Sequence, residues 1–317
     1  MHVGGLDGHH GGVCRGGVRA GRTGWSGHAG EATKKKKKKK KRTPVPPHAP
    51  PQSSPSPPPP RPPASQVDHA DPAHTALHAF NDLWDAHFAA DSLLVYSTGR
   101  SHALYEQLQR EVPALRPPGA LVCSVGTEIF FEADHAAPTP DAAWCTTLDA
   151  GGWDRGRVEA IAAAAAPELT LQPASEQRPH KASFHLALPR ADAPPVLARL
   201  KAALGDAGLA TSLIYSGGAD VDVLPAGASK GKGLAFLLGQ MADAVGPPVE
   251  GVLVCGDSGN DIDLFEVDGV RGVVVANAHE ELRAWAEAHR SDGRVFEAGE
   301  RCAGGIAQAL RHFGLVT

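Results

Sequence analysis

From Val67 to the end of the chain, apolar residues recur either at the three-to-four spacing of helices or in the short runs of buried strands. Leu77, Phe80 and Trp84 show the first pattern, and the run from Leu93 to Tyr96 shows the second. The spacing predicts helices over Thr75–Phe88, Ser101–Arg110, 154–166, Val196–Leu204, Gly231–Met241, Glu280–His289 and Ile306–Phe313, and another that starts near Asn260. It predicts strands over Leu93–Tyr96, Leu121–Cys123, Ile129–Phe131, Leu169–Leu171, Phe184–Leu188, Leu213–Tyr215, Val221–Leu224, Val252–Cys255 and Val273–Val275.

The order of these elements predicts a core built from two separate stretches of chain. Strands alternate with helices over residues 67–148 and again over 225–317, which is typical of a parallel sheet covered by helices on both faces. Residues 149–224 between them read as a compact α+β unit. We therefore expect an α/β protein with a Rossmann-like parallel-sheet core and an inserted α+β cap domain.

Residues 1–66 differ from the rest of the chain in amino-acid composition. They contain an unbroken lysine run, Lys34–Lys41, and a stretch over 43–66 that is dominated by Pro, Ser and Ala. Such a segment has too little apolar surface to offset the entropy of ordering, so we expect a disordered, low-complexity tail. Two alternatives stay open, a nuclear-localisation or RNA-binding role for the lysines and a wrongly predicted first exon.

Charge and cysteine usage exclude several classes of function. Residues 67–317 carry a net charge of about −15, against about +11 for residues 1–66, and an acidic body argues against nucleic-acid binding there. The five cysteines form no CxxC pair and are odd in number, which indicates neither a zinc site nor a disulfide framework and favours the reducing cytoplasm. No run approaches roughly 18 apolar residues, so we expect neither a membrane span nor a secretory signal.

The stretch from Val252 to Asp261, read VLVCGDSGND, carries the sharpest local signal. A buried strand would deliver Asp257 to the carboxyl edge of a parallel sheet, where such sheets bind ligands, and Asp261 would follow one helical turn later. Two carboxylates beside the amide of Asn260 suit a hard cation such as Mg²⁺, which prefers oxygen ligands. An Asx-turn with a helix N-cap is the alternative.

Two further features suit a phosphate. Ser97, Thr98, Gly99 and Arg100 follow another predicted strand, where a hydroxyl and backbone N–H groups at a helix start form a natural phosphate cradle. Lys230 opens a later predicted helix and could place one positive charge against a phosphate oxygen. Taken singly, a plain helix cap and a solvated lysine explain these residues equally well.

In combination these features resemble the haloacid dehalogenase-like superfamily, in which a hydroxyl-ended strand, a lysine and a Gly-Asp-x-x-x-Asp strand end follow in this order around a cap. Over essentially all of residues 67–317 the chain resembles the sucrose-phosphate phosphatases of that superfamily. The stretches that carry the resemblance are Val67–His69, Phe80–Trp84, Asp91–Ser101, Ser124–Glu128, Glu176–Lys181, Tyr215–Gly218 and Cys255–Asp261.

The resemblance implies hydrolysis of sucrose 6-phosphate with Mg²⁺ as cofactor, in the cytoplasm, with sucrose-phosphate synthase as a further partner. It implies that Thr98 binds the transferring phosphoryl group and Lys230 steadies its charge, while Asp257 ligates the metal with Asn260 and Asp261 in support. The cap would bind the sugar through Gln177, Arg178, His180 and Lys181, with Glu128, Asp220 and Asn277 as further lining residues. From the residues alone these cap donors suit a polyhydroxylated anion, and a solvated loop is the alternative.

One family feature is missing from the sequence. In the family the reaction begins on a hydrophobic strand ending in Asp-x-Asp, whose first aspartate attacks phosphorus and whose second acts as general acid and base. That strand would end just before Val67, where Pro57–Gln66 contains neither an apolar run nor an acid. Its neighbours in the sheet would then lack a partner. A catalytically inactive sugar-phosphate-binding protein and a phosphatase for another sugar phosphate are therefore the alternative functions.

Overall fold

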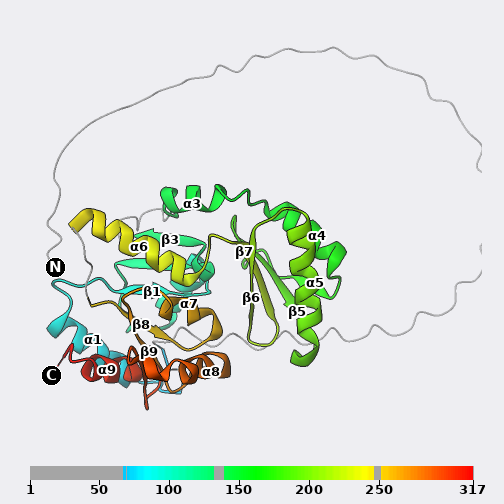
Figure 1. The fold of residues 1–317 in the computed structure, drawn as a ribbon. Coiled ribbons are helices and arrows are strands. Elements are labelled where there is room, and N and C mark those ends of the chain that lie inside the picture. Colours follow the sequence, from blue (N-terminus) through cyan, green and yellow to red (C-terminus); the bar gives the residue numbers. More distant parts are fainter. Residues whose placement is uncertain (1–66, 69, 132–138, 246–250, 317) are drawn as a thin grey trace, which may run out of the picture. The chain divides into compact units, whose positions relative to one another are not determined.

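The computed structural model describes residues 67–68, 70–131, 139–245 and 251–316. The predictions made for residues 1–66 lie outside these ranges. Figure 1 shows the order of the elements along the chain. None of the described helices combines the length and the apolar character needed to cross a lipid bilayer.

The core sheet consists of two three-stranded parts. In the first, β1 pairs in parallel with β2, and β2 pairs in antiparallel fashion with β3. In the second, β9 lies between β8 and β10, and all three strands are parallel. Among the described residues, β1 and β8 therefore each have a hydrogen-bonded neighbour on one side only. The strands are β1 (Val95–Ser97), β2 (Ala120–Cys123), β3 (Glu128–Phe131), β8 (Leu253–Gly256), β9 (Arg271–Val274) and β10 (Val295–Glu297).

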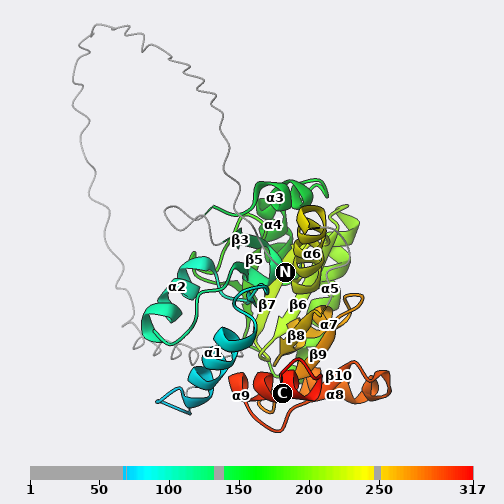
Figure 2. The same cartoon turned by 90° about the vertical axis from the view of Figure 1, so that its left-hand side faces the viewer.

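One hydrophobic cluster joins the two parts of the core sheet. It contains Tyr96 of β1 and Val273 of β9, together with Phe80 of the first helix and Ile306 of the last. These two helices, α1 and α9, lie side by side although they are far apart in sequence (Figures 1 and 2). The helices of the core are α1 (Thr75–His87), α2 (His102–Glu111), α3 (Ala142–Asp149), α6 (Lys230–Val245), α7 (Ile262–Phe265), α8 (Glu280–Ala288) and α9 (Cys302–His312).

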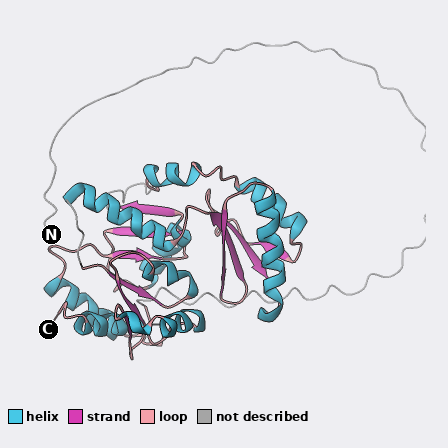
Figure 3. Ribbon diagram, in the orientation of Figure 1, coloured by secondary structure: helices cyan, strands magenta, loops and turns pink. Residues whose placement is uncertain are grey.

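The cap is a four-stranded antiparallel sheet in the order β4-β5-β7-β6, with helices α4 and α5 packed on one face (Figure 3). An Asp154 side chain caps α4 by accepting a hydrogen bond from the backbone N–H of Arg157 at 3.0 Å. The elements are α4 (Arg155–Ala165), β4 (Leu169–Leu171), β5 (Ala182–Leu186), α5 (Ala193–Asp206), β6 (Thr211–Ser216) and β7 (Asp220–Pro225).

Alternation along the cap strands separates two faces. Phe184 of β5 and Val221 and Val223 of β7 are buried in the cap cluster with the helices. Ser183, which precedes Phe184, and Asp222, between the two valines, point to the opposite face because successive strand side chains alternate. The cap sheet therefore has an apolar face under its helices and a polar face away from them.

Most predicted elements are confirmed within a few residues, with three differences. The sequence pattern missed α3 and the three-residue strand β10, and it did not indicate that β3 would run antiparallel to β2. Hydrophobic spacing carries no information on strand direction, and a three-residue strand is too short to show a period. The predicted domain boundaries at 149 and 224 stay predictions.

Candidate active site

The loop that follows β8 is held by the carboxylate of Asp261. One oxygen of this carboxylate accepts hydrogen bonds from the backbone N–H groups of Asp257 and Ser258, both at 3.0 Å, and from the Ser258 hydroxyl at 3.2 Å. Ser258 and Asp261 form a reciprocal capping box around the 3₁₀ turn Gly259–Asp261. The alternative of a helix cap thus describes Asp261 well, and it leaves the side chain of Asp257 for another role.

Lys230 and Asp257 give this loop its electrostatic character. The Lys230 ammonium lies 2.5 Å from the second oxygen of Asp261, and both side chains are almost fully buried, with 6% and 3% of their surface exposed. Burial, reinforced by the nearby charge of Asp261 and only partly offset by Lys230, raises the pKa of Asp257 to about 6. Asp257 is therefore a carboxylate whose negative charge is not fully compensated.

The loop after β1 presents hydroxyl groups and backbone donors at a helix start. The backbone of buried Thr98 continues the pairing with β2 through a 2.8 Å hydrogen bond to the carbonyl of Val122. The Thr98 hydroxyl accepts from the Arg100 N–H at 3.1 Å, and Ser101 caps α2 by accepting from the Leu104 N–H at 3.4 Å. The buried hydroxyl of Ser97 has no hydrogen-bond partner among the described residues, which suits a group that meets a ligand.

The turn Ser124–Gly126, which follows β2, has unusual backbone angles and lies between the loop after β1 and the start of α6. Ser124 and Val125 adopt positive φ values of 52° and 61°, which β-branched valine rarely does. Gly126 follows with φ 89°, and a Cβ atom there would lie 2.1 Å from the carbonyl oxygen of Ser229. Only glycine allows this approach, so the turn packs directly against the backbone at the start of α6, where Lys230 lies.

The cap residues predicted to bind sugar come from the hairpin Glu176–Lys181, and all four have partners within the protein. The Gln177 amide donates to the carbonyls of Gln172 and Ser183 and accepts from the Ser183 N–H. The Arg178 guanidinium lies 3.3 Å from Glu128 of the core. The remaining pairs are His180 with Asp149 at 2.8 Å, and Lys181 with Asp222 at 3.5 Å and Glu176 at 3.9 Å.

The sequence analysis missed Asp222, which lies on the polar face of the cap sheet. Its carboxylate is 2% exposed and accepts a hydrogen bond from the Ser183 hydroxyl at 2.6 Å, in addition to its contact with Lys181. The signal was present, since Asp222 is a charged residue inside the apolar strand Val221–Leu224. A buried acid in such a strand needs a partner, and here the partner is Lys181.

Three further predicted residues have structural contacts. The Asn260 side-chain oxygen accepts from the Ser258 hydroxyl at 2.8 Å, so it supports the loop that holds Asp257. Asn277 accepts from the Cys302 N–H at 2.9 Å and thereby fastens the start of α9. Asp220 lies 3.6 Å from His185 on the polar face of the cap sheet.

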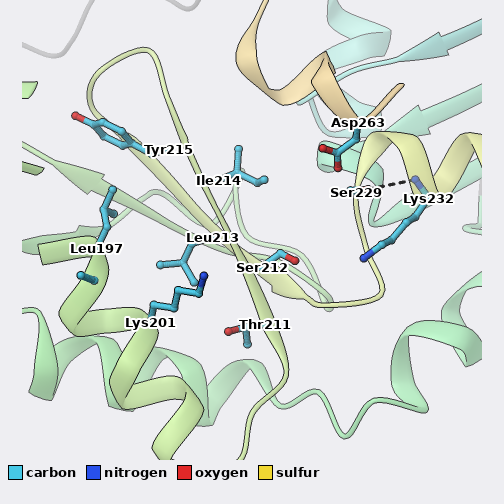
Figure 4. A pocket seen from close by; sticks show the side chains of 11 residues that line it. Leu197, Lys201, Thr211, Ser212, Leu213, Ile214, Tyr215, Ser229, Lys232 and Asp263 are labelled. Atoms are coloured by element: carbon cyan, nitrogen blue, oxygen red, sulfur yellow. Dashed lines mark hydrogen bonds between the residues drawn. The ribbon is translucent and has the colours of Figure 1, made fainter. Parts of the chain in front are cut away.

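A cavity of about 440 Å³ lies between the cap and the core, on the side of β6 where α5 packs (Figure 4). Its walls include Lys201 and Leu213 from the cap and Ser229, Lys232 and Asp263 from the core. None of the predicted catalytic, metal or sugar-binding residues lines it. The cavity and the loops around Asp257 are thus separate features.

The described residues include no cluster of three or more metal-ligating side chains. Asp257 is nevertheless suited to a cation, because burial and the nearby Asp261 charge disfavour its ionised form, which a bound cation would stabilise. Asp261 is largely occupied by Lys230 and by backbone N–H groups. A carboxylate oxygen of Asp257 is a donor that suits a hard divalent cation.

Comparison with known proteins adds a family to this geometry. Residues 65–314 match the family model described as sucrose-6F-phosphate phosphohydrolase. Sucrose-phosphatase 1 of Nicotiana tabacum is 45% identical over 245 residues, which are 77% of this chain and 56% of that protein. The chain therefore spans about half the length of this plant relative.

Two other proteins are matched over most of their length. The mannosylfructose-phosphate phosphatase of Agrobacterium fabrum is 34% identical over 76% of this chain and 91% of its own. The crystal structure of the sucrose-phosphatase from Synechocystis, in complex with sucrose and phosphate, is 32% identical with a TM-score of 0.67, and the match covers 79% of this chain and 94% of that chain. The predicted fold class, a Rossmann-like haloacid dehalogenase core with an inserted cap, is confirmed by this match.

Proposed function

The chain belongs to the sucrose-6F-phosphate phosphohydrolase family, and we propose that it serves the hydrolysis of sucrose 6-phosphate to sucrose and phosphate. The observation that carries this proposal is the pair of loops at the carboxyl ends of β1 and β8. One offers hydroxyl and backbone donors around Thr98, and the other carries Asp261, paired with Lys230, next to Asp257, whose pKa is raised by burial. Such a combination suits a phosphate ester and a metal ion.

We propose Mg²⁺ as the cofactor, with Asp257 as its ligand. A bound Mg²⁺ would offset negative charge on the phosphoryl oxygens. Asp261 and Asn260 act by holding the loop in place. In this proposal the Lys230 ammonium, held by Asp261, offsets phosphate charge, and the Thr98 hydroxyl, which accepts from the Arg100 N–H, donates its hydrogen to a phosphoryl oxygen.

The sugar would bind against the polar face of the cap sheet. His180 and Lys181 of the hairpin are the sugar-side donors that we propose, and each is paired here with a carboxylate, Asp149 and Asp222 respectively. Gln177 supports them by fixing the hairpin to β5, and Arg178 extends from it to Glu128. These assignments explain why polar residues gather on this face.

The nucleophile is the part that the described residues do not supply. We infer that an aspartate would reach the site on a strand lying between β1 and β8, because each of these strands has one side without a described partner. The sequence directly before Val67 is rich in proline, which lacks the N–H that a central strand must donate. Efficient hydrolysis therefore requires a different segment in this position.

A grafted strand tests the proposal. Replacing residues 57–66 with about six apolar residues followed by Asp-x-Asp should complete the sheet and give Mg²⁺-dependent release of phosphate from sucrose 6-phosphate. The chain with its own residues 57–66 should release far less. The matched control changes the first grafted aspartate to asparagine, which should abolish turnover without unfolding the protein. A folded, Mg²⁺-replete graft without turnover would contradict the proposed function.

A phosphatase for a different sugar phosphate is the second candidate. The observation that favours it is the match to a mannosylfructose-phosphate phosphatase over 91% of that protein. The grafted enzyme should distinguish the two candidates by its kcat/KM for sucrose 6-phosphate against mannosylfructose phosphate, because specificity is a ratio of these values.

A third possibility within this proposal concerns the chain without a grafted strand. If the ungrafted chain binds sucrose 6-phosphate without hydrolysing it, the chain is an inactive sugar-phosphate-binding protein. The partner that we propose for this function is the sucrose-phosphate synthase. Its place of action would be the cytoplasm. Titration calorimetry of the ungrafted chain with sucrose 6-phosphate distinguishes this function from the enzymatic one, because an inactive binding protein would give the heat of binding without release of phosphate.

A further inference from the structure

An arginine of the cap reaches a carboxylate of the core. Arg178 lies in the hairpin Glu176–Lys181, and its Nε is 3.3 Å from Oε2 of Glu128, the first residue of β3. The two side chains are 19% and 10% exposed, so the pair is largely shielded from water. The guanidinium also donates to the carbonyls of Gln177 and Ser175, which fixes its direction.

The core partner of this pair is tied to the strained turn. Glu128 accepts a 2.8 Å hydrogen bond from the hydroxyl of Ser124, at the same oxygen that faces Arg178. Ser124 and Val125 are the two non-glycine residues of the turn with positive φ. Residues in such conformations persist only where the surrounding structure holds them, and here Glu128 is one of the holding groups.

The strained turn contacts both residues proposed to bind phosphate. The N–H of Val125 donates to the carbonyl of Thr98 at 3.1 Å. Gly126 packs against the backbone of Ser229 and Lys230, and a Cβ atom at Gly126 would lie 2.8 Å from the backbone nitrogen of Lys230. A continuous set of contacts thus runs from the cap arginine through Glu128 and the turn to Thr98 and Lys230.

We propose that Arg178 and Glu128 are positioning residues, and that their ion pair, here called the clasp, holds the cap against the core. Through Glu128 the pair also fixes the conformation of the turn, which positions Thr98 and Lys230. This gives Arg178 a different role from the direct sugar contact predicted by the sequence. When the cap moves away, Glu128 loses its cation, and the turn loses one of its restraints. The phosphate site is then complete only while the cap is closed.

Another ion pair between cap and core provides a matched control. Arg190 of the cap lies 2.6 Å from Glu281 of α8, but these side chains are 57% and 30% exposed. Exposed pairs contribute little because water and salt screen them. The clasp and this control therefore differ in burial and in contact with the turn, while both span the same two parts of the chain.

The first arm of the experiment measures the cap position in the full chain. Spin labels on introduced cysteines at exposed Ala202 of α5 and Ala235 of α6, in a Cys14→Ser/Cys145→Ser background, report the distance between cap and core. Glu128→Gln keeps the shape of the side chain and removes its charge. We expect the ratio of long to short distances to rise by about fivefold or more, as for other coupled sites. Glu281→Gln should leave the ratio unchanged.

The second arm measures the affinity for inorganic phosphate in Mg²⁺ by titration calorimetry, and this arm rests on the proposed function. Glu128→Gln should weaken phosphate binding about fivefold or more, although Glu128 does not touch phosphate in this account. Arg178→Gln should do the same, and the double variant should be no weaker than either single one, because the two residues act as a unit.

The outcomes separate the two proposals. Unchanged distances in Glu128→Gln would overturn the clasp, and so would additive losses in the double variant. Wild-type protein that binds no phosphate would count against the proposed function at this site, while the distance arm would still decide the clasp.

Discussion

The cap sheet and the core sheet differ in how their strands find partners. In the cap, four antiparallel strands form one continuous sheet, and all of them come from residues 169–225. In the core, strands from both ends of the described chain form two separate three-stranded parts. The cap therefore needs only its own stretch of chain, whereas in the core β1 and β8 each have a hydrogen-bonded neighbour on one side only among the described residues.

Each region also contains a buried lysine–aspartate pair, and the pairs differ in what surrounds them. In the cap, Lys181 lies between two carboxylates and Asp222 has a further hydroxyl donor. In the core, Lys230 meets Asp261, and the second carboxylate, Asp257, keeps a raised pKa. The cap pair is satisfied within the protein, and the core pair leaves charge for a ligand.

The largest effect is expected for Lys230→Met. Removing the ammonium leaves Asp261 buried without a counter-charge, and breaking such a pair typically costs about 3–5 kcal/mol of unfolding free energy. Chemical denaturation at pH 7 measures this loss. Lys232→Met is the control, since Lys232 is exposed on the same helix and should change little. Equal losses for both variants would show that the buried pair is not what stabilises this loop.

Leu200→Ala tests whether the cap behaves as an independent unit. Leu200 of α5 is fully buried in the cap cluster, so the cavity should cost about 2–5 kcal/mol. Amide exchange should show that protection falls in β5 and β7 and stays unchanged in β8 and β9. Lys201→Ala, at the exposed neighbouring position, should leave both regions unchanged. Equal loss of protection in cap and core would mean that the two unfold together.

Asp257→Asn should stabilise the metal-free protein at neutral pH. A carboxyl with a raised pKa favours the folded state while it is protonated, and that contribution is lost as the pH rises from about 4 through about 6. At pH 7 the asparagine variant should gain as much as about 3 kcal/mol, and at pH 4 nothing. Thermal unfolding across this range measures the difference.

Added Mg²⁺ sharpens this test. It should raise the melting temperature of the wild type and not that of Asp257→Asn, because a ligand stabilises only the state that binds it. A variant that is less stable than the wild type at pH 7 without metal would contradict the role assigned to Asp257.

The smallest effect is expected for Glu281→Gln on stability. The exposed pair with Arg190 should contribute less than about 1 kcal/mol, and added salt should remove that contribution. Denaturation at low and high ionic strength measures both quantities. A salt-independent loss of unfolding free energy well above this value would contradict the expectation and show that the Arg190 contact stabilises the protein as much as the buried pairs do.

Much of the fold follows from residue patterns. The spacing of Leu77 and Phe80 predicted α1, because a helix buried on one face has that period, and the run LVC predicted β2, because a strand buried on both faces is apolar throughout. Helix α3 was missed although Asp141 caps it and Trp144 and Leu148 are buried one turn apart. That signal was present in the sequence. The direction of β3 was not, because direction depends on how distant strands pair.

The candidate site was predicted in part. Residue spacing indicated that Asp257 and Asp261 would lie one turn apart, and the structure adds that Asp261 is a structural anchor while Asp257 is not. The contact of Arg178 with Glu128 joins residues 50 positions apart, and the positive φ of Val125 has no sequence signature. Features of this kind depend on tertiary packing, which hydrophobic periodicity does not record.

Amide exchange of β1 and β8, with and without the grafted strand, tests most directly whether the core sheet is one strand short. We predict fast exchange in Val95–Ser97 and Leu253–Gly256 of the ungrafted chain, and a slowing of about a hundredfold or more after grafting, with β5 and β7 of the cap unchanged. Protection in β1 and β8 that already equals that of the cap strands, and that the graft does not alter, would contradict this prediction.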